Sequence, residues 1–379
     1  MTKRVKQLKV IHVASGDLWA GAEAQVYTLL KTLKKMDDVT VYAVIFNDGE
    51  LSKKLENDEI NTTVLDETHL NSWQILGRLR SLFHEIQPDI IHTHRLKENV
   101  LATIANKLST NVSLVATIHG DSEFHYPNWK IHKQAPQWIN WLFTRFFYKK
   151  LIAVSKDLGE KLHSSYPRKI ILVVENGIDI EAVKLAANSS HFEKNSDIKY
   201  HIAIAGRLEQ VKRVDIFLDT AKLLIDSSPK NEWDFHIFGE GSLEAFLKEK
   251  TLKNAIEKHV TFHGHRSDIA SCLKAMDCLV MCSDHEGLPM TPLESIAVGT
   301  PVIAHQTGGL INIIEGQSGC LLVSNHTPKG YSEAVSKLFN IDQQCEHTGK
   351  NGLDPLNQKF TATTNGELIA TSYRNLLKT

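Results

Sequence analysis

Short apolar runs alternate with amphipathic segments along most of the chain. Runs rich in Val and Ile predict buried strands, and the amphipathic segments between them predict helices. This alternation is typical of βαβ units, in which helices cover both faces of a parallel sheet. In the first half we expect strands at LKVIHV from Leu8, VTVYAVIF from Val39, TTVL from Thr62, DIIHTH from Asp89, LVATIH from Leu114, LIAVS from Leu151 and IILVVEN from Ile170.

A second series of strands follows a polar segment. Residues 181–199 carry no strand pattern, and we expect them to form a surface linker. The pattern therefore predicts an α/β protein with two Rossmann-like, doubly wound domains over residues 1–180 and 200–360, and a last helix in 361–379. The expected strands of the second domain are HIAIAG from His201, DFHIFG from Asp234, HVTFHG from His259, DCLVMC from Asp277 and PVIAH from Pro301.

Apolar residues at helical spacing support this interpretation. One stripe, which should cover the second sheet, consists of Val214, Phe217, Leu218, Ala221 and Leu224. The corresponding stripe in the first domain consists of Val26, Leu29, Leu30 and Leu33.

The composition of the 379-residue chain fits two globular domains and disfavours one class of function. Hydrophobic residues make up 42% and charged residues 23%, as in ordinary folded proteins. The 43 basic and 44 acidic residues nearly cancel, and no long basic run is present. Because a nucleic-acid backbone needs a basic surface, a dedicated DNA or RNA binder is disfavoured.

The cysteines and the N-terminus indicate where the protein works. The five cysteines are odd in number and lie in the second half of the chain, so we interpret them as reduced thiols. The N-terminus is a short basic stretch without a cleavable apolar segment, and no apolar run is long enough to span a membrane. We therefore expect a cytoplasmic protein.

The loop richest in candidate chemistry follows the expected strand DCLVMC and runs from Ser283 to Glu294. Ligands of such folds bind at the carboxyl ends of the strands, where the N–H groups of a helix terminus suit a phosphate. We expect that helix to begin at Pro292, with Thr291 as its cap. Glu286 and Glu294 would accept hydrogen bonds from sugar or ribose hydroxyls. For Glu294 the alternative is a capping box with Thr291, which needs no ligand.

A second loop, AGRLEQVKRVD, places Arg207 and Lys212 between a strand and a helix. These two cations would neutralise a diphosphate bound at the helix terminus, Arg through its forked guanidinium and Lys as a point charge. Taken alone, such a pair is more often a solvated surface. Its combination with the Glu286 loop favours the diphosphate.

Three features of the first domain are candidates for ligand contact. Gly21 lies in a tight strand-to-helix turn that lets the backbone approach a ligand, although no dinucleotide fingerprint is present. His119 ends a strand and should line the cleft; a structural histidine is the alternative. His92 and His94 alternate as metal ligands do, but the sequence offers no matched third ligand, so we expect no metal site.

Together these residues resemble a known family. Gly21 with Glu23, His119, the NGID motif from Asn176, GRLEQVK from Gly206 and Glu286-x7-Glu294 are similar to motifs of the retaining nucleotide-sugar glycosyltransferases of family 4. The resemblance spans roughly Leu8 to Gly319 and implies the GT-B fold, in which two Rossmann-like domains face a central cleft. It also implies that the last helix, in 361–379, crosses back to the first domain.

The resemblance implies a role for each candidate residue. The residues implied to contact the donor diphosphate are Gly21, Arg207, Lys212, Met290 and Thr291. Those implied to contact the donor sugar, ribose or base are Gly287, Leu288, Pro289, Glu294, His263 and Arg266. His119 and Glu286 would lie at the reaction centre. No cofactor and no essential divalent cation are implied, and uridine diphosphate is the expected carrier.

The acceptor side is less defined by the sequence. The family resemblance implies a glycan or lipid-linked acceptor, as in surface polysaccharide biosynthesis. Residues 129–150 are rich in aromatic and basic side chains, so they indicate either peripheral contact with the inner face of the membrane or a buried wall of the cleft. Two alternative functions are a nucleotide-sugar epimerase of GT-B fold and a non-catalytic sugar-nucleotide-binding protein.

Overall fold

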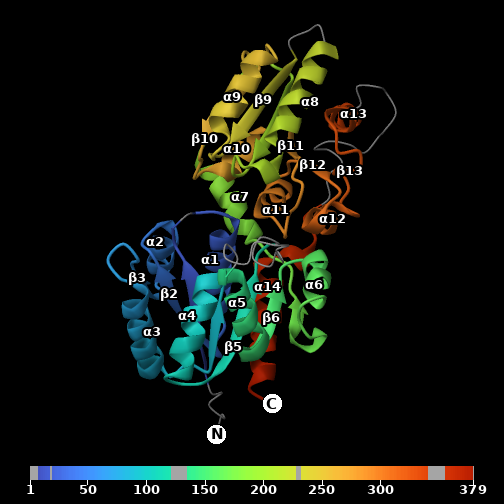
Figure 1. Ribbon diagram of the computed structural model, residues 1–379. Coiled ribbons are helices and arrows are strands. Elements are labelled where there is room, and N and C mark those ends of the chain that lie inside the picture. The colour runs from blue at the N-terminus through green and yellow to red at the C-terminus, as the bar shows by residue number, and fades with distance from the viewer. Residues whose placement is uncertain (1–6, 18, 121–134, 228–231, 340–354, 379) are drawn as a thin grey trace. The chain divides into compact units, whose positions relative to one another are not determined.

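The computed structural model describes residues 7–17, 19–120, 135–227, 232–339 and 355–378. The chain forms two compact units (Figure 1). Unit 1 comprises Met1–Gly177 and Lys359–Thr379, and unit 2 comprises Ile178–Gln358. Among the described residues, none of the helices has the length and apolar character needed to cross a bilayer.

Unit 1 contains a seven-stranded parallel sheet with the order β3-β2-β1-β4-β5-β6-β7. The order reverses between β1 and β4, so this is a doubly wound sheet with its switch point between those two strands. The strands are β1 (Leu8–Ser15), β2 (Val39–Phe46), β3 (Asn61–Leu65), β4 (Ile90–Thr93), β5 (Ser113–Ile118), β6 (Tyr148–Ala153) and β7 (Ile171–Val173).

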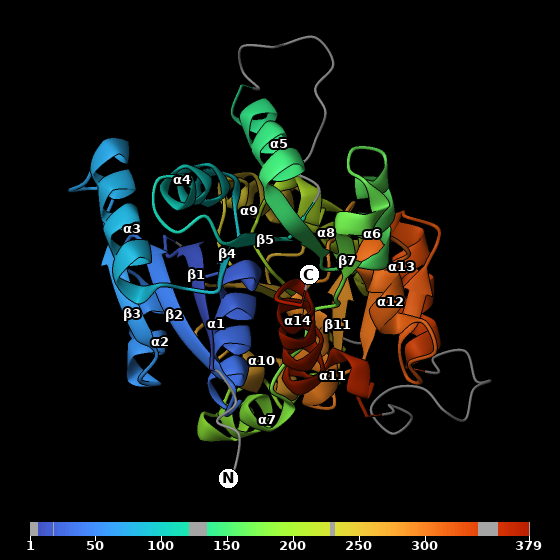
Figure 2. The same cartoon turned by 90° about the horizontal axis from the view of Figure 1, so that it is seen from below.

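Helices cover both faces of this sheet. In Figure 2, α1 and α14 lie side by side on one face, whereas α3, α4 and α5 lie on the other. Val26 and Leu30 of α1 pack in one apolar cluster with Ile369 and Tyr373 of α14, so the end of the chain completes the core of unit 1. The helices of unit 1 are α1 (Gly21–Lys34), α2 (Glu50–Asn57), α3 (Ser72–Ile86), α4 (Leu96–Lys107), α5 (Ala135–Phe147), α6 (Lys156–His163), the 3-10 turn η3 (Arg168–Ile170) and α14 (Ala362–Leu376).

Unit 2 contains a six-stranded parallel sheet with the order β10-β9-β8-β11-β12-β13. Its switch point lies between β8 and β11. The strands are β8 (Tyr200–Ala205), β9 (Trp233–Phe238), β10 (Val260–Gly264), β11 (Cys278–Met281), β12 (Val302–His305) and β13 (Leu321–Val323). The sequence predicts all of these except β13.

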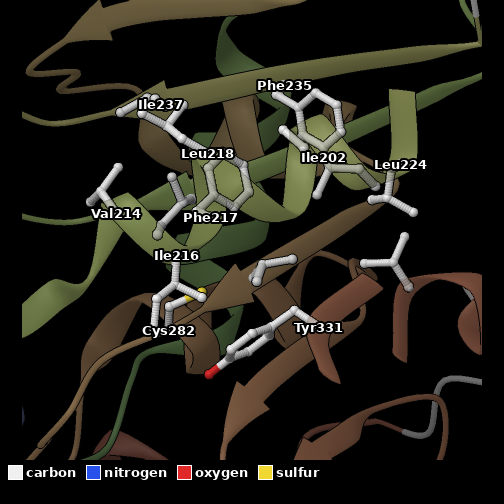
Figure 3. Packing of buried hydrophobic residues seen from close by; sticks show 14 of the residues in the cluster. Ile202, Val214, Ile216, Phe217, Leu218, Leu224, Phe235, Ile237, Cys282 and Tyr331 are labelled. Atoms are coloured by element: carbon white, nitrogen blue, oxygen red, sulfur yellow. The ribbon is translucent and has the colours of Figure 1, made fainter. Parts of the chain in front are cut away.

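The core of unit 2 follows the stripe predicted from helical spacing. Phe217 of α8 packs against Phe235 of the sheet, and Leu218 of α8 and Tyr331 of α13 belong to the same apolar cluster (Figure 3). Part of the segment expected as a linker is helical. It forms α7, which packs on α10 within unit 2. The helices of unit 2 are α7 (Ile180–Ser189), η4 (Gln210–Lys212), α8 (Val214–Ser227), α9 (Glu244–Lys253), α10 (Ile269–Ala275), α11 (Met290–Ala297), α12 (Gly308–Ile314) and α13 (Pro328–Leu338). The 3-10 turn η6 (Gln358–Phe360) spans the point where the chain returns to unit 1.

The cysteines that the structure describes are all free thiols. Cys272, Cys278 and Cys282 are buried and Cys320 is partly buried, while Cys345 lies outside the described residues. Burial raises the pKa of the Cys320 thiol to about 12, so this group stays protonated and unreactive.

Candidate functional site

The principal candidate site of unit 2 lies at its switch point. β8 and β11 are neighbours in the sheet, and the loops that follow them leave the same edge. The first loop contains Arg207 and Lys212, and the second contains Ser283 and Glu286. Gly206, Arg207, Lys212 and Ser283 are among the residues that line one small hollow. The topology therefore brings the two loops selected from the sequence to one place.

Lys212 and Glu286 form the central contact between the two loops. The Nζ of Lys212 lies 2.5 Å from Oε1 of Glu286, which also accepts a 2.6 Å hydrogen bond from the Ser283 hydroxyl. Both charged side chains are largely buried, with exposed fractions of 17% and 10%. The Arg207 side chain is exposed, and within the described part of the chain it has no ion pair. One cation is thus positioned by a carboxylate and the other is available to a ligand.

A second set of contacts, which the sequence analysis missed, joins the same loops. Arg213, in the left-handed region with φ 49°, forms a bidentate pair with Asp215, with distances of 3.0 and 2.9 Å. Its other guanidinium nitrogen lies 3.2 Å from Asp284, which also contacts Nε2 of His326 at 3.1 Å. Because Asp284 belongs to the β11 loop, this network fixes the position of the Lys212–Glu286 pair. In the sequence, the neighbouring charges of KRVD (Lys212 to Asp215) could have indicated this network.

The helix after the second loop begins earlier than the sequence suggested. Pro289 is the N-cap and Met290 the first residue of α11, so the expected start at Pro292 with Thr291 as cap is wrong. The cap makes no side-chain hydrogen bond, and the alternative capping box of Thr291 with Glu294 does not form. Pro289 at the cap and Pro292 in the first turn carry no N–H, so the free backbone donors at this helix terminus belong to Met290 and Thr291.

Glu294 lies in the second turn of this helix, and its carboxyl group is partly buried. No hydrogen bond or ion pair of this carboxyl group is found among the residues that the structure describes. Burial raises its pKa to about 7, because the charged form loses solvation without gaining a partner. A perturbed, unpaired carboxyl group beside a helix terminus is a candidate for ligand contact.

Two glycines of α12 support the backbone of the Glu286 loop. A Cβ atom on Gly309 would lie 1.8 Å from the carbonyl oxygen of Gly287, and one on Gly308 would lie 2.2 Å from that of Glu286. The N–H of Gly309 donates to the Glu286 carbonyl at 3.2 Å. Only glycine permits this close approach of α12 to the backbone of Glu286 and Gly287. The next residue of the loop, Leu288, is buried.

His263 and Arg266 lie at and after the end of β10. His263 is half-buried, stacks on Phe238 and contacts Nδ1 of His236 through its Nε2 at 3.0 Å. Burial, with a smaller effect of Arg266, lowers the pKa of His263. The Arg266 guanidinium is engaged by Asp268 in two hydrogen bonds of 2.8 and 2.7 Å. Arg266 is thus held by Asp268, and one face of the His263 ring is covered by Phe238.

Unit 1 has its own group of polar residues at the carboxyl edge of its sheet. Gly21 is the first residue of α1, and Glu23 in the same turn is 3% exposed. Arg95, which caps α4, forms an ion pair with Glu23. His119 directly follows β5, with its Nε2 3.3 Å from Nδ1 of His94. Burial and the charge of Arg95 lower the pKa of His119 to about 3, so this histidine is neutral.

The third histidine that the sequence could not supply is His12 of β1. It lies beside His92 and His94, and ring nitrogens of the three come within 4.8 Å of one another. Each of their ring nitrogens already has a hydrogen-bond partner, and the rings of His92 and His94 are stacked rather than convergent. This donor set therefore fits a hydrogen-bonded chain better than a metal ion. A second cluster of possible ligands comprises His201, Asp234 and His236 in unit 2.

Two protein-family models match this chain. The model of glycosyl transferases group 1 matches residues 188–354, and that of glycosyltransferase family 4 matches residues 19–182. Together they span both units.

Two relatives, similar over most of their length, agree with these models. The chain is 28% identical over 290 residues to an Escherichia coli UDP-Gal:alpha-D-GlcNAc-diphosphoundecaprenol alpha-1,3-galactosyltransferase, covering 73% of this chain and 74% of that protein. It is 22% identical over 349 residues to a capsular polysaccharide biosynthesis glycosyltransferase of Staphylococcus aureus, covering 88% and 90%.

Solved structures share the fold. An Anabaena protein crystallised with UDP-glucose superposes with a TM-score of 0.79 at 19% identity, over 97% of this chain and 100% of that one. Sucrose-phosphate synthase from Thermosynechococcus elongatus superposes with a TM-score of 0.74 at 16% identity, over 98% and 99%. The fold is GT-B, as the sequence predicts.

Proposed function

Because the chain belongs to the group 1 and family 4 glycosyltransferases, we propose that it transfers a hexosyl unit from a UDP-linked sugar to a glycan or lipid-linked acceptor, with retention of configuration. The acceptor would be an intermediate of surface polysaccharide assembly. The observation that supports this proposal most strongly is the Lys212–Glu286 pair at the switch point of unit 2, next to the N-terminus of α11.

The diphosphate of the donor would bind between the two loops. Lys212 is positioned by Glu286, and the exposed Arg207 supplies a second positive charge. The backbone donors of Met290 and Thr291 add the partial positive charge of the helix terminus. When the glycosidic bond of the donor breaks, negative charge grows on the diphosphate, so these groups stabilise the transition state more than the ground state.

The remaining residues would position the donor. The Glu294 carboxylate would accept hydrogen bonds from the ribose, while the backbone of Gly287 to Pro289 and the Glu286 side chain would orient the sugar. The His263 face would contact the base. With Glu286 engaged by Lys212 and Ser283, we propose that this carboxylate forms no covalent intermediate. The acceptor hydroxyl would attack on the face from which the diphosphate leaves, and its proton would pass to an oxygen of the departing diphosphate.

We propose UDP as the carrier because solved structures of the same fold contain UDP and UDP-glucose and because the Escherichia coli relative is named for a UDP-linked donor. That relative is also named for a diphosphoundecaprenol acceptor. With Arg207 and Lys212 neutralising the diphosphate, transfer would proceed without a divalent cation. Full activity after removal of metal ions by EDTA is the expected result.

A lipid-linked acceptor would require contact with a membrane surface, and α5 is the proposed contact. Trp138, Leu142 and Phe146 lie along one face of α5 and are 49%, 47% and 66% exposed. Arg145 and the nearby Lys150 add positive charge, which attracts anionic lipid. Residues 129–134 of the stretch selected from the sequence lie outside the described residues.

Liposome flotation tests this contact. The wild-type protein should float with vesicles that contain anionic lipid, and the double variant Trp138→Ser, Phe146→Ser should not. Leu252→Ser is the matched control, since Leu252 is 65% exposed on α9 of unit 2. Failure of the wild-type protein to float would exclude a membrane contact through α5.

Transfer itself is tested with purified protein, radiolabelled sugar nucleotides and candidate acceptors. We expect UDP release that depends on the acceptor, and a product whose anomeric configuration by NMR equals that of the donor. Conversion of the sugar nucleotide without an acceptor would instead indicate an epimerase. Binding without turnover of any donor would indicate a non-catalytic protein, and an inverted product would refute retention.

A further inference from the structure

Three histidines occupy the centre of unit 1, where a doubly wound sheet normally has apolar side chains. His12 of β1 and His92 of β4 are register partners across the switch point, and both are fully buried. His94 directly follows β4 and is 3% exposed. Burying three imidazoles costs solvation free energy, which hydrogen bonds must offset. Each of the six ring nitrogens has such a partner.

The ring nitrogens form a continuous chain that begins at His119. Nε2 of His119 lies 3.3 Å from Nδ1 of His94, and Nε2 of His94 lies 3.0 Å from Nδ1 of His12. The free end of this chain is Nδ1 of His119, which is closed off from solvent and has no hydrogen-bond partner among the described residues.

The chain continues through the last helix of the protein. Nε2 of His12 lies 3.3 Å from the hydroxyl of Tyr373 in α14, which lies 2.5 Å from Nδ1 of His92. Nε2 of His92 then contacts the Thr117 hydroxyl of β5 at 2.7 Å. Six side chains from four elements and two loops are therefore joined end to end: His119, His94, His12, Tyr373, His92 and Thr117.

All four imidazoles are neutral. Burial lowers the pKa of His12 and of His119 to about 3, and it lowers the pKa of His92 and His94 well below the ordinary value. A neutral imidazole has one N–H and one bare nitrogen, so a ring that accepts at one nitrogen must donate at the other. The Tyr373 hydroxyl has one proton but can accept two hydrogen bonds. The hydrogen bonds of the chain therefore all run toward His119, all run away from it, or converge on Tyr373 from both sides.

The two ends of the chain select the direction. Thr117 is 6% exposed, and within the described residues its hydroxyl contacts only His92. If the bonds run away from His119, the buried Thr117 proton and the bare Nδ1 of His119 both lack partners. If they converge on Tyr373, the Tyr373 proton and the bare Nδ1 of His119 both lack partners. If they run toward His119, the protons of Thr117 and Tyr373 are used and only the Nδ1–H of His119 remains unpaired. Since each unpaired buried group is costly, the direction toward His119 is favoured.

We propose that this chain, closed by Tyr373, holds His119 in the tautomer with its proton on Nδ1, so that His119 donates a hydrogen bond to an oxygen of the bound substrate. This role rests on the proposed function of the site. In this tautomer Nδ1 cannot accept a proton, so His119 acts as a hydrogen-bond donor and not as a general base. Tyr373 and His12 touch no reacting atom and are positioning residues.

NMR of the full-length protein with ¹⁵N-labelled imidazoles tests the tautomer without any need for turnover. The His119 resonances are assigned by their loss in His119→Gln. We expect the wild-type protein to show a proton on Nδ1 of His119. Tyr373→Phe removes the link to Thr117, so a substantial fraction of the Nε2–H tautomer should appear.

Tyr148→Phe is the matched control, since Tyr148 is equally buried in unit 1 but its hydroxyl contacts Thr93 and Asn99. This variant should keep the wild-type tautomer. A wild-type His119 with its proton on Nε2 would overturn the proposal, as would equal behaviour of the two variants or a stoichiometric metal ion held by the three buried histidines.

Kinetics separate this proposal from the proposed function. Loss of one neutral hydrogen bond to the substrate should lower kcat of Tyr373→Phe by about 3- to 10-fold, with little change in the KM for the sugar nucleotide. If the wild-type protein transfers no sugar but shows the Nδ1–H tautomer, the proposed function fails and the hydrogen-bonded chain stands. If transfer is observed but the tautomer is Nε2–H, the proposed role of the hydrogen-bonded chain is refuted and the proposed function stands.

Discussion

The ammonium group of Lys212 lies 2.5 Å from Oε1 of Glu286, and these two residues come from loops that follow different strands of unit 2. Neither charge is solvated well, because both side chains are largely buried. In the absence of a ligand, each charge is therefore stabilised mainly by the other. A bound diphosphate would share Lys212 with Glu286, so binding of the donor and the position of Glu286 are coupled.

Removing either member of this pair should impair transfer. We predict that Lys212→Ala and Glu286→Ala each lower kcat/KM by about 10²-fold or more, because each variant loses one preorganised electrostatic contact and leaves the other charge unpaired. The double variant should lose less than the product of the two single effects. Lys222→Ala, which breaks the solvent-exposed pair with Asp226 on α8, is the control and should be unaffected. Near-normal rates in both single variants would refute the site.

The raised pKa of Glu294, about 7, predicts a pH dependence of donor binding. Only the ionised carboxylate accepts from both ribose hydroxyls, so affinity for UDP-glucose should rise by up to about tenfold between about pH 6 and pH 8. The free energy of unfolding depends on pH in the opposite direction, because the raised pKa of Glu294 favours its protonated form in the folded state. The stabilisation from protonated Glu294 is fully present below the pKa of the unfolded chain and is lost as the pH rises through about 7.

Calorimetric titration at several pH values measures this effect. UDP-glucose is the appropriate ligand because its esterified diphosphate, unlike the terminal phosphate of UDP, does not titrate in this range. Glu294→Gln should bind with an affinity that is independent of pH. A wild-type affinity that is equally flat would show that Glu294 does not contact the donor.

A methyl group on Gly309 should displace the Glu286 loop. The Cβ atom would lie 1.8 Å from the Gly287 carbonyl oxygen, so the loop backbone must move. We predict that Gly309→Ala lowers donor affinity at least tenfold, as measured by calorimetric titration. Gly77→Ala on α3 is the control: nothing lies within 4 Å of its Cβ, and the change should add up to about 1 kcal/mol of stability through helix propensity. Unchanged donor binding by Gly309→Ala would contradict the role of the loop.

The core of unit 2 predicts a stability effect that is separate from the site. Phe217 is 1% exposed and packs against Phe235 with ring centroids 5.7 Å apart. Phe217→Ala should lower the free energy of unfolding by about 3 to 5 kcal/mol, since it leaves a cavity under the sheet. Phe246→Ala, at a position of 53% exposure on α9, should change it by less than about 0.5 kcal/mol. Urea unfolding measures both, and equal effects would contradict the packing.

The strands were predictable because a parallel sheet buries both faces of each strand, so every strand reads as an apolar run. VTVYAVIF from Val39 became β2 without a shift of either end. β13 (Leu321–Val323) was missed because its apolar run is short. β7 (Ile171–Val173) is equally short, but it lies in a longer apolar run from Ile170 to Val174. The start of α11 was misplaced because Pro292 and Thr291 match strong local preferences for a helix terminus. The backbone of the Gly287 loop instead starts the helix at Met290.

The donor-site residues could be selected from the sequence because each lies in a loop after a strand, and topology brings such loops together. The contacts of His12, Tyr373 and His326 could not be predicted from the sequence. His12 and His92 are 80 residues apart in the sequence and meet only because β1 pairs with β4. Tyr373 reaches them from α14, and no local pattern marks a tyrosine as the partner of a distant histidine.

The most direct test of the central claim is a crystal structure of the protein with UDP bound. We predict that the diphosphate contacts the side chains of Arg207 and Lys212 and the backbone N–H groups of Met290 and Thr291, with the ribose at Glu294. A diphosphate bound away from the loops after β8 and β11 would contradict this donor site.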